Sequence, residues 1–395
     1  MHILTINSSI ELADDYTVTP GEYAVEDVAG GQFLCLANGG TMRPLEEKRV
    51  PMFSASDADR ELMIHRESNP DRFIEEPCSS ILISRLGGLG DLVLLTPVLR
   101  EIKRRWPSVK LAVTGIKEFL QPLMHLPYVD ELLPSPVSME VMRNYDGWIF
   151  LENVIERSPG NDKLNSVDLV ANHIGLDMSQ ADKRQDYRVT MRENIWAEEA
   201  FPRINGTRRL CVQVGASARI RTYPQPLLGQ VVATMLKNKW EVFLMGGGGT
   251  IKMEPRPGLH LMADGYTFRQ RCAVIAGADC VLAPDSSLTH IAGALEIPCV
   301  ALYSVFHSNQ RTKYAPTTFA INAPAACAPC QHHEYLNHPF PKDGPCAVKG
   351  FCVPLSEIKP ERIVALIETR AKGFKLHLVE DLPAATTPVS DAPAT

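Results

Sequence analysis

Short apolar runs alternate with amphipathic stretches along the chain from about residue 80. The apolar runs predict strands at Ile81–Ser84, Lys110–Thr114, Glu131–Leu133 and Trp148–Leu151. Between them, apolar steps of three and four predict one helix near Glu118–Met124 and one that buries Leu92, Leu95, Leu99, Ile102 and Trp106. Pro97 lies inside this last pattern, where we expect it to kink the helix or confine its regular part to one side. Strands spaced by helices in this order indicate βαβ units and a parallel sheet.

A second block with the same alternation begins near residue 209. Its predicted strands are 209–215, Trp240–Met245, Cys280–Ala283 and Pro298–Tyr303. Its predicted helices are Pro226–Asn238, Phe268–Ala276, Asp285–Leu295 and Pro360–Thr369. Two doubly wound blocks of similar size predict two facing domains, with the ligand site in the cleft between them.

The two ends of the chain have different patterns. Residues 1–75 are rich in β-formers, with a hairpin-like signal over Tyr16–Val25 around Pro20-Gly21 and a short strand at Gln32–Ala37. We predict a small β-rich accessory module here, followed by a charged connector over Asp57–Glu76. The predicted α/β domains are then 76–200 and 201–372. We predict a disordered tail over 373–395, because the last residues of the tail are rich in proline and have little to bury.

Composition narrows the class of protein without naming an activity. The chain has 395 residues, is 45% hydrophobic and 22% charged, and carries a net charge of −6, which gives no global attraction to nucleic acid or to an anionic membrane. Met1–Thr5 lacks the pattern of a signal peptide, and no apolar run is long enough for a membrane helix. We therefore expect a cytoplasmic protein whose ten cysteines are mostly reduced.

A glycine-rich turn with a carboxylate joins the first predicted strand to its helix. It contains Gly87, Gly88, Gly90 and Asp91, in a spacing that differs from the dinucleotide-binding G-x-G-x-x-G pattern. Loops at the ends of parallel strands carry the chemistry of many α/β enzymes. An aspartate at such a place is also commonly a helix N-cap, so the local residues leave both roles open.

Two segments of the second block suit a phosphate. Ser217, Arg219 and Arg221 follow a predicted strand, and guanidinium groups pair well with phosphate oxygens, although a solvated basic loop has the same composition. In the other segment, Asp285 and then Ser286, Ser287, Thr289 and His290 lead into a helix whose N-terminus offers an anion site. The alternative there is that Asp285 or Ser286 caps the helix.

Four cysteines cluster near the C-terminus, at Cys327, Cys330, Cys346 and Cys352. The C-x2-C half matches a zinc knuckle, whereas the C-x5-C half is looser, and His332, His333 and His338 are possible substitute ligands. A structural zinc is one interpretation, and disulfides or free thiols are the other. No motif of an open, catalytic zinc site accompanies the cluster.

Together, the three ordered motifs resemble glycosyltransferase family 9, the bacterial lipopolysaccharide heptosyltransferases. Residues 81–100 are similar to I-R-L-x-x-L-G-D-x-x-x-T-x-P-x-L of that family, 215–224 to G-A-S-x-x-x-K-x-W-P, and 285–294 to D-S-G-x-x-H-x-A-A-A. The resemblance covers roughly residues 80–372. It differs from the family pattern at Arg221 for lysine, Tyr223 for tryptophan and Ser287 for glycine.

The resemblance implies an α/β fold of the GT-B type, with the acceptor on the first domain and a nucleotide-diphosphate sugar, an ADP-sugar being favoured, on the second. It assigns the general base to Asp91 and the acceptor side to Gly87, Gly88 and Gly90. The donor side falls to Ser217, Arg219, Arg221, Asp285, Ser286, Ser287, Thr289 and His290. The expected reaction is an inverting, heptose-like sugar transfer to a glycan or lipid-linked acceptor, with no metal required for catalysis.

The unfamiliar N-terminal module leaves other functions open. One is a phage or mobile-element glycosyltransferase that acts on a modified nucleobase in DNA or on a protein, although the acidic net charge disfavours DNA. A function of another class is a non-catalytic glycan or nucleotide-sugar binding protein, which would not need the base Asp91. A GT-B-type epimerase would predict more carboxylates around the first glycine turn than this chain offers.

Overall fold

The computed structural model describes several stretches of the chain, which include both predicted blocks and part of the N-terminal segment. These are residues 1–13, 16–25, 40–51, 62–67, 78–246, 256–262, 265–325, 327–330 without 329, and 351–371. The strand predicted at Gln32–Ala37, the glycines at 247–249, Cys346 and the tail 373–395 lie outside the described residues.

The N-terminal residues form two small antiparallel sheets, one in the order β4-β1-β5 and one that pairs β2 with β3. The turn at Pro20-Gly21 separates β3 from β4, but each strand pairs elsewhere, so the predicted hairpin is wrong. The strands are β1 (His2–Ile6), β2 (Ile10–Ala13), β3 (Tyr16–Val18), β4 (Gly21–Val25) and β5 (Thr41–Pro44).

A six-stranded sheet in the order β10-β9-β8-β11-β7-β6 forms the first α/β domain. β6 and β7 join it antiparallel, so the prediction of a connector over residues 57–76 is wrong where the structure describes it, at β7. The sheet thereby takes two strands from the segment predicted as a separate module. Its strands are β6 (Glu47–Pro51), β7 (Met63–Glu67), β8 (Ser80–Ser84), β9 (Lys110–Gly115), β10 (Glu131–Pro134) and β11 (Gly147–Phe150).

Helix α2 is the central helix of this domain and runs unbroken from Leu89 to Arg105. One alternative of the prediction, that Pro97 confines the regular part of the helix to one side of the proline, is therefore wrong. A proline at 97 cannot donate to the carbonyl of Val93, and the hydroxyl of Thr96 donates to that oxygen at 2.8 Å instead. The helix predicted near Glu118–Met124 is two 3-10 turns, η1 (Lys117–Phe119) and η2 (Gln121–Leu123). The other helices are α3 (Met139–Met142), α4 (Val154–Arg157) and α5 (Ser166–Ile174).

A second six-stranded sheet, entirely parallel and in the order β14-β13-β12-β15-β16-β17, forms the C-terminal domain. Its strands are β12 (Arg208–Gln213), β13 (Trp240–Met245), β14 (Leu259–Met262), β15 (Cys280–Pro284), β16 (Cys299–Tyr303) and β17 (Thr318–Asn322). The helices are α7 (Gln225–Lys237), α8 (Phe268–Ala276), α9 (Ser287–Ala294), α10 (Ser308–Thr312), α13 (Val353–Ser356) and α14 (Pro360–Ala371), with a 3-10 turn η3 (Arg219–Arg221).

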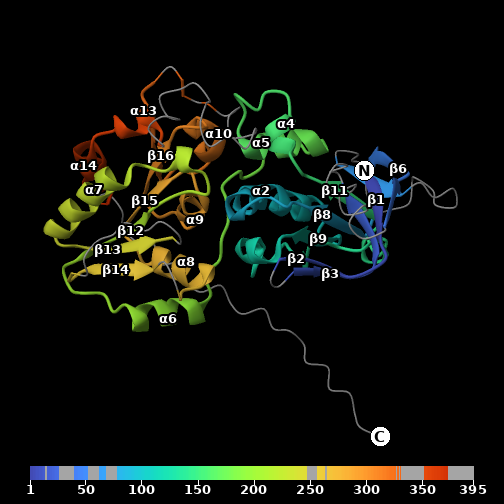
Figure 1. The fold of residues 1–395 in the computed structure, drawn as a ribbon, viewed down its shortest axis with the longest axis horizontal. Coiled ribbons are helices and arrows are strands. Elements are labelled where there is room, and N and C mark those ends of the chain that lie inside the picture. The colour runs from blue at the N-terminus through green and yellow to red at the C-terminus, as the bar shows by residue number, and fades with distance from the viewer. Residues whose placement is uncertain are drawn as a thin grey trace, which may run out of the picture.

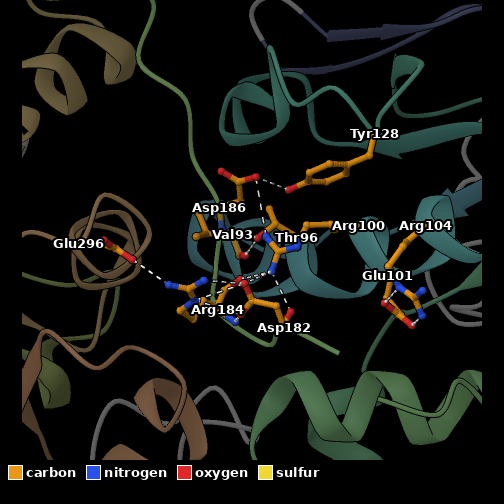
Figure 2. A network of polar contacts seen from close by, with 10 residues as sticks. All are labelled: Val93, Thr96, Arg100, Glu101, Arg104, Tyr128, Asp182, Arg184, Asp186 and Glu296. Atoms are coloured by element: carbon orange, nitrogen blue, oxygen red, sulfur yellow. Dashed lines mark hydrogen bonds and ion pairs between the residues drawn. The ribbon is translucent and has the colours of Figure 1, made fainter. Parts of the chain in front are cut away.

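The two domains stand side by side, with α2 of one facing α9 of the other (Figure 1). Residues 175–190, which lie between α5 and α6 (Met191–Ala200), form the linker between the domains. Hydrogen bonds attach this linker to both domains. Figure 2 shows Arg100 of α2 donating to the carbonyls of Asp182 and Arg184, while Arg184 reaches Glu296 beyond α9 at 3.0 Å. The hydroxyl of Thr96 also accepts the N–H of Asp186. The linker therefore sets how the two helices face each other.

Candidate active site

The N-termini of α2 and α9 meet across the interface between the domains. Gly90, in the first turn of α2, packs so closely on α9 that a Cβ there would lie 3.0 Å from the His290 ring and 3.5 Å from the Cα of Ser287. Gly87 is confined in the same way, because its Cβ would lie 2.8 Å from the Asp91 carboxylate. The two glycines let the turn fold tightly against both the carboxylate and the opposite domain.

Asp91 lies on the third residue of α2 rather than at its N-cap, which is Gly88. Its Oδ2 accepts the N–H of Gly88 at 2.9 Å, and its Oδ1 lies 3.4 Å from Nη2 of Arg85. Burial raises the pKa of Asp91, but Arg85, Arg311, His290 and the Gly88 hydrogen bond outweigh it, and the net shift is downward. With 28% of its side chain exposed, Asp91 is a fixed, ionised carboxylate that still faces the cleft.

The turn that carries Asp91 is held by residues at the ends of two neighbouring strands. Arg85 follows β8, is buried, and donates to the carbonyl of Leu151 at 2.7 Å. Glu152 follows β11 and accepts the N–H of Leu86 with both carboxylate oxygens, at 2.8 and 2.9 Å. Burial raises the pKa of Glu152 above its usual range. Sequence reasoning missed both residues, although the arginine directly after the first strand was a visible signal.

On the opposite wall, Arg221 connects two of the predicted donor segments. Its Nη2 donates to Oγ of Ser217 at 2.6 Å, and its Nη1 donates to the carbonyl of Asp285 at 3.2 Å and lies 3.7 Å from the carboxylate of Asp285. The guanidinium thereby brings the segment after β12 onto the N-terminus of α9. A cation next to the N-terminus of a helix is the combination that binds a diphosphate.

The first turn of α9 is partly structural. Thr289 is fully buried, and its hydroxyl donates to the carbonyl of Pro284 at 2.7 Å, so that this hydroxyl is turned away from the cleft. Ser286 is the N-cap of α9, but its side chain makes no capping hydrogen bond. His290 is buried against Asp285, with Nε2 3.9 Å from Oδ1. Burial lowers the pKa of His290 to about 4, which leaves the ring neutral near pH 7.

A cleft of about 1450 Å³ contains most of the predicted site residues. Gly87 and Thr289 are not among the residues that line it. From the prediction, its walls contain Gly88, Gly90, Asp91, Ser217, Arg219, Arg221, Asp285, Ser286, Ser287 and His290. The cleft also holds Arg311 of α10, which lies outside all three sequence motifs and was missed for that reason. Tyr223, which stands where the family pattern has tryptophan, also lines the cleft, and its largely buried side chain donates to the carbonyl of Ile358.

The cysteine cluster is described for three of its four members. Cys330 and Cys352 are buried in one hydrophobic cluster, and Cys327 is exposed. Among the described residues, no group of three or more His, Cys, Asp or Glu side chains forms a metal site, and Cys346 is outside them. The zinc prediction therefore stays a prediction. None of the described helices is long and apolar enough to cross a membrane.

Two facing α/β domains with a cleft between them define a GT-B-type fold, as predicted. The model of glycosyltransferase family 9 (heptosyltransferase) matches residues 142–340, and the chain belongs to this family. A search of curated proteins finds no match.

Solved structures with low sequence identity share the fold. Heptosyltransferase II of E. coli, an ADP-heptose lipopolysaccharide enzyme, is 16% identical with a TM-score of 0.56, over 74% of this chain and 98% of that chain. A family 9 glycosyltransferase from Veillonella parvula is 14% identical with a TM-score of 0.57, over 74% and 97%. The iron-containing dodecameric glycosyltransferase TibC of enterotoxigenic E. coli is 14% identical with a TM-score of 0.56, over 94% and 93%. The likeness to TibC extends further along this chain than the likeness to the other two.

Proposed function

We propose that this protein transfers a heptose from ADP-heptose to an acceptor hydroxyl with inversion at the anomeric carbon. The observation that carries the proposal is the division of the cleft: a fixed carboxylate, Asp91, stands on one domain, and Arg221 with the N-terminus of α9 stands on the other. Family membership supports sugar transfer. Two similar structures, ADP-heptose lipopolysaccharide heptosyltransferase II and TibC in complex with ADP-D-beta-D-heptose, support this choice of donor.

In the proposed reaction, the carboxylate of Asp91 takes the proton of the acceptor hydroxyl as its oxygen bonds to the anomeric carbon. The bond between that carbon and the diphosphate oxygen breaks, and ADP leaves with the electron pair. Arg221 and the N–H groups of α9 stabilise the charge that develops on the leaving diphosphate. Attack from the face opposite the leaving group gives inversion. No step of this scheme passes through a metal ion.

The acceptor is proposed to be a glycan of the lipopolysaccharide type, as for heptosyltransferase II. A protein hydroxyl is the second candidate, and the first domain offers an observation for it. The exposed large apolar side chains include Leu86 of the Asp91 turn, Ile116 after the adjacent strand β9, and Met124 after η2. Apolar exposure at this edge of the sheet suits a polypeptide better than an anionic sugar core.

A structural metal held by Cys327, Cys330, Cys346 and Cys352 is a further part of the proposal. The burial of Cys330 and Cys352 in one hydrophobic cluster fits such a site, and the structurally similar TibC is an iron-containing glycosyltransferase. Thiolates bind zinc and iron alike. Elemental analysis of the purified chain and of Cys330→Ser would identify the metal. If the purified protein contains no stoichiometric metal, the proposed structural metal site is rejected.

A panel of ADP-, UDP- and GDP-sugars tests the donor. We expect ADP-heptose to raise the melting temperature most, since a ligand that binds the native state alone stabilises it. ADP release is then measured with a lipopolysaccharide core acceptor and with a serine-rich peptide. Release stimulated by either acceptor supports transfer and identifies its class. Donor binding without release under any condition would instead establish a binding protein, and no response to any donor would remove the donor assignment.

A further inference from the structure

Arg311 is a buried cation of the cleft, and the reaction above gives it no role. Nη1 of Arg311 donates to Oγ of Ser166 at 2.7 Å, and the guanidinium carbon lies 3.9 Å from the centroid of the Phe306 ring. The residue is 7% exposed and still lines the cleft. Phe306 belongs to the C-terminal domain, whereas Ser166 begins α5 of the first domain. The side chain is therefore held by both domains at once.

The place of this guanidinium is costly. Burying a charge costs free energy unless it is paired, and Ser166 lies at the positive end of α5, which disfavours a cation. A neutral side chain of similar size would pack on Phe306 and avoid both costs. Among the described residues, the carboxylates of Asp91, Glu156 and Asp285 line the cleft together with Arg311.

Among the described residues, Arg85 at the end of β8 lies beside Asp91, and His290 of α9 and Arg311 of α10 line the same cleft as Asp91. All three lower the pKa of the Asp91 carboxyl. Arg85 is anchored within the same domain through the carbonyl of Leu151, so it is present whatever the other domain does. His290 is neutral near pH 7. Arg311 is thus a permanent charge of the C-terminal domain that lines the cleft with the base.

The docking of α10 on α5 has several bonds. Besides the Arg311 contact, Oγ of Ser166 donates to the carbonyl of Gln310 at 3.0 Å, and Nδ2 of Asn165 donates to the carbonyl of Asn309 at 2.9 Å. The side chain of Gln310 in turn donates to the carbonyl of Asn161 at 2.6 Å. These bonds fix the position of Arg311 relative to the first domain.

We propose that Arg311 is a positioning residue for the base: Ser166 and Phe306 hold its charge opposite Asp91, so the carboxylate takes its reactive setting only where α10 is docked on α5. This inference rests on the proposed role of Asp91. The setting of the base then depends on both domains, since Arg311 belongs to the domain that is proposed to bind the donor. Arg311 acts through Asp91 and takes no proton itself.

The direct test is a carbon-13 NMR titration of the Asp91 carboxyl in the full chain, assigned by its loss in Asp91→Asn. In Arg311→Gln we expect the midpoint of the titration to rise by about one pH unit, because a nearby positive charge is removed. Ser166→Ala keeps the charge but removes its anchor, and we expect a smaller rise. Arg203→Gln is the matched control, since Arg203 is an arginine of the C-terminal domain that pairs with Asp279 and does not line the cleft, and its midpoint should equal that of the wild type.

The kinetic test separates positioning from donor binding. With ADP-heptose, the acid limb of the pH profile of kcat should move upward in Arg311→Gln by the same amount, with KM for the donor changed less than about twofold. An unchanged carboxyl titration in both Arg311→Gln and Ser166→Ala would overturn the inference, as would a large rise in KM without a shifted acid limb. Because the titration needs no turnover, it can support the positioning role of Arg311 even if the protein does not catalyse the proposed reaction. Ser166→Ala keeps the test open if Arg311→Gln does not fold.

Discussion

The two walls of the cleft share the same local fold but carry groups of opposite chemical character. Each is a parallel strand, a tight turn and a helix N-terminus, β8 to α2 on one side and β15 to α9 on the other. On the first wall the helix keeps a carboxylate, Asp91, with Arg85 beside it. On the second wall the carboxylate, Asp285, is buried and lies 3.7 Å from the guanidinium of Arg221. The same local fold thus offers a proton acceptor on one domain and an anion site on the other.

A large loss of ADP affinity is expected on the anion side. Arg221→Met removes the guanidinium that joins Ser217 to Asp285, and we expect ADP affinity to fall by about 10- to 100-fold, the value of one or two charged hydrogen bonds. Arg219→Met is the matched control in the same loop, because Arg219 lines the cleft but is exposed. Calorimetric titration with ADP measures both. Equal losses in the two variants would mean that the loop attracts ADP by its charge alone.

The stability of the second wall should depend on pH through His290. The pKa of His290 in the folded protein is about 4, below its ordinary value of 6.5, so the folded state binds fewer protons than the unfolded state between these values. Stability is therefore full above about pH 6.5 and is lost as pH falls toward 4, by about 3 kcal/mol in all. Denaturant unfolding at several pH values should show this loss reduced in His290→Gln. The exposed His125, replaced by Asn, is the control, and an equal reduction there would contradict the assignment.

The smallest effect concerns the contact between the walls. Gly90→Ala places a Cβ 3.0 Å from the buried His290 ring, whereas Gly229→Ala on α7 meets nothing within 4 Å. Replacing glycine by alanine inside a helix raises the free energy of unfolding by about 0.5–1 kcal/mol. We expect Gly229→Ala to gain that stability and Gly90→Ala to lack the gain and to lose activity several-fold. Equal thermal stabilisation at both positions would show that the walls are not in tight contact.

Much of this arrangement was predictable from local pattern. The strands and helices of both α/β blocks follow the apolar periodicities closely, and Phe268–Ala276 and Trp240–Met245 match the prediction residue for residue. The order of motifs then brings Asp91, Arg221 and the α9 segment into one cleft. The strands and helices are predictable because each depends on residues close together in the sequence, whereas the shared cleft was expected from the family resemblance.

What the sequence could not reveal depends on contacts between distant segments. β6 and β7 join the first sheet because β11 offers an edge, which no local pattern encodes. Thr289 looks like a donor ligand in the motif, but the chain path places the Pro284 carbonyl within reach of its hydroxyl. Arg311 lies on a helix of five residues outside any motif, and its role depends on a serine of the other domain.

The placement of the base and the donor site on different domains is tested most sharply by measuring ADP affinity and kcat together in Asp91→Asn. The variant keeps the size of the side chain and removes its ability to take a proton. We predict an ADP Kd within about threefold of the wild type, with kcat lowered by at least about 100-fold. Sugar transfer at the wild-type rate in the folded variant would contradict this division of roles, and so would an ADP affinity lost in step with kcat.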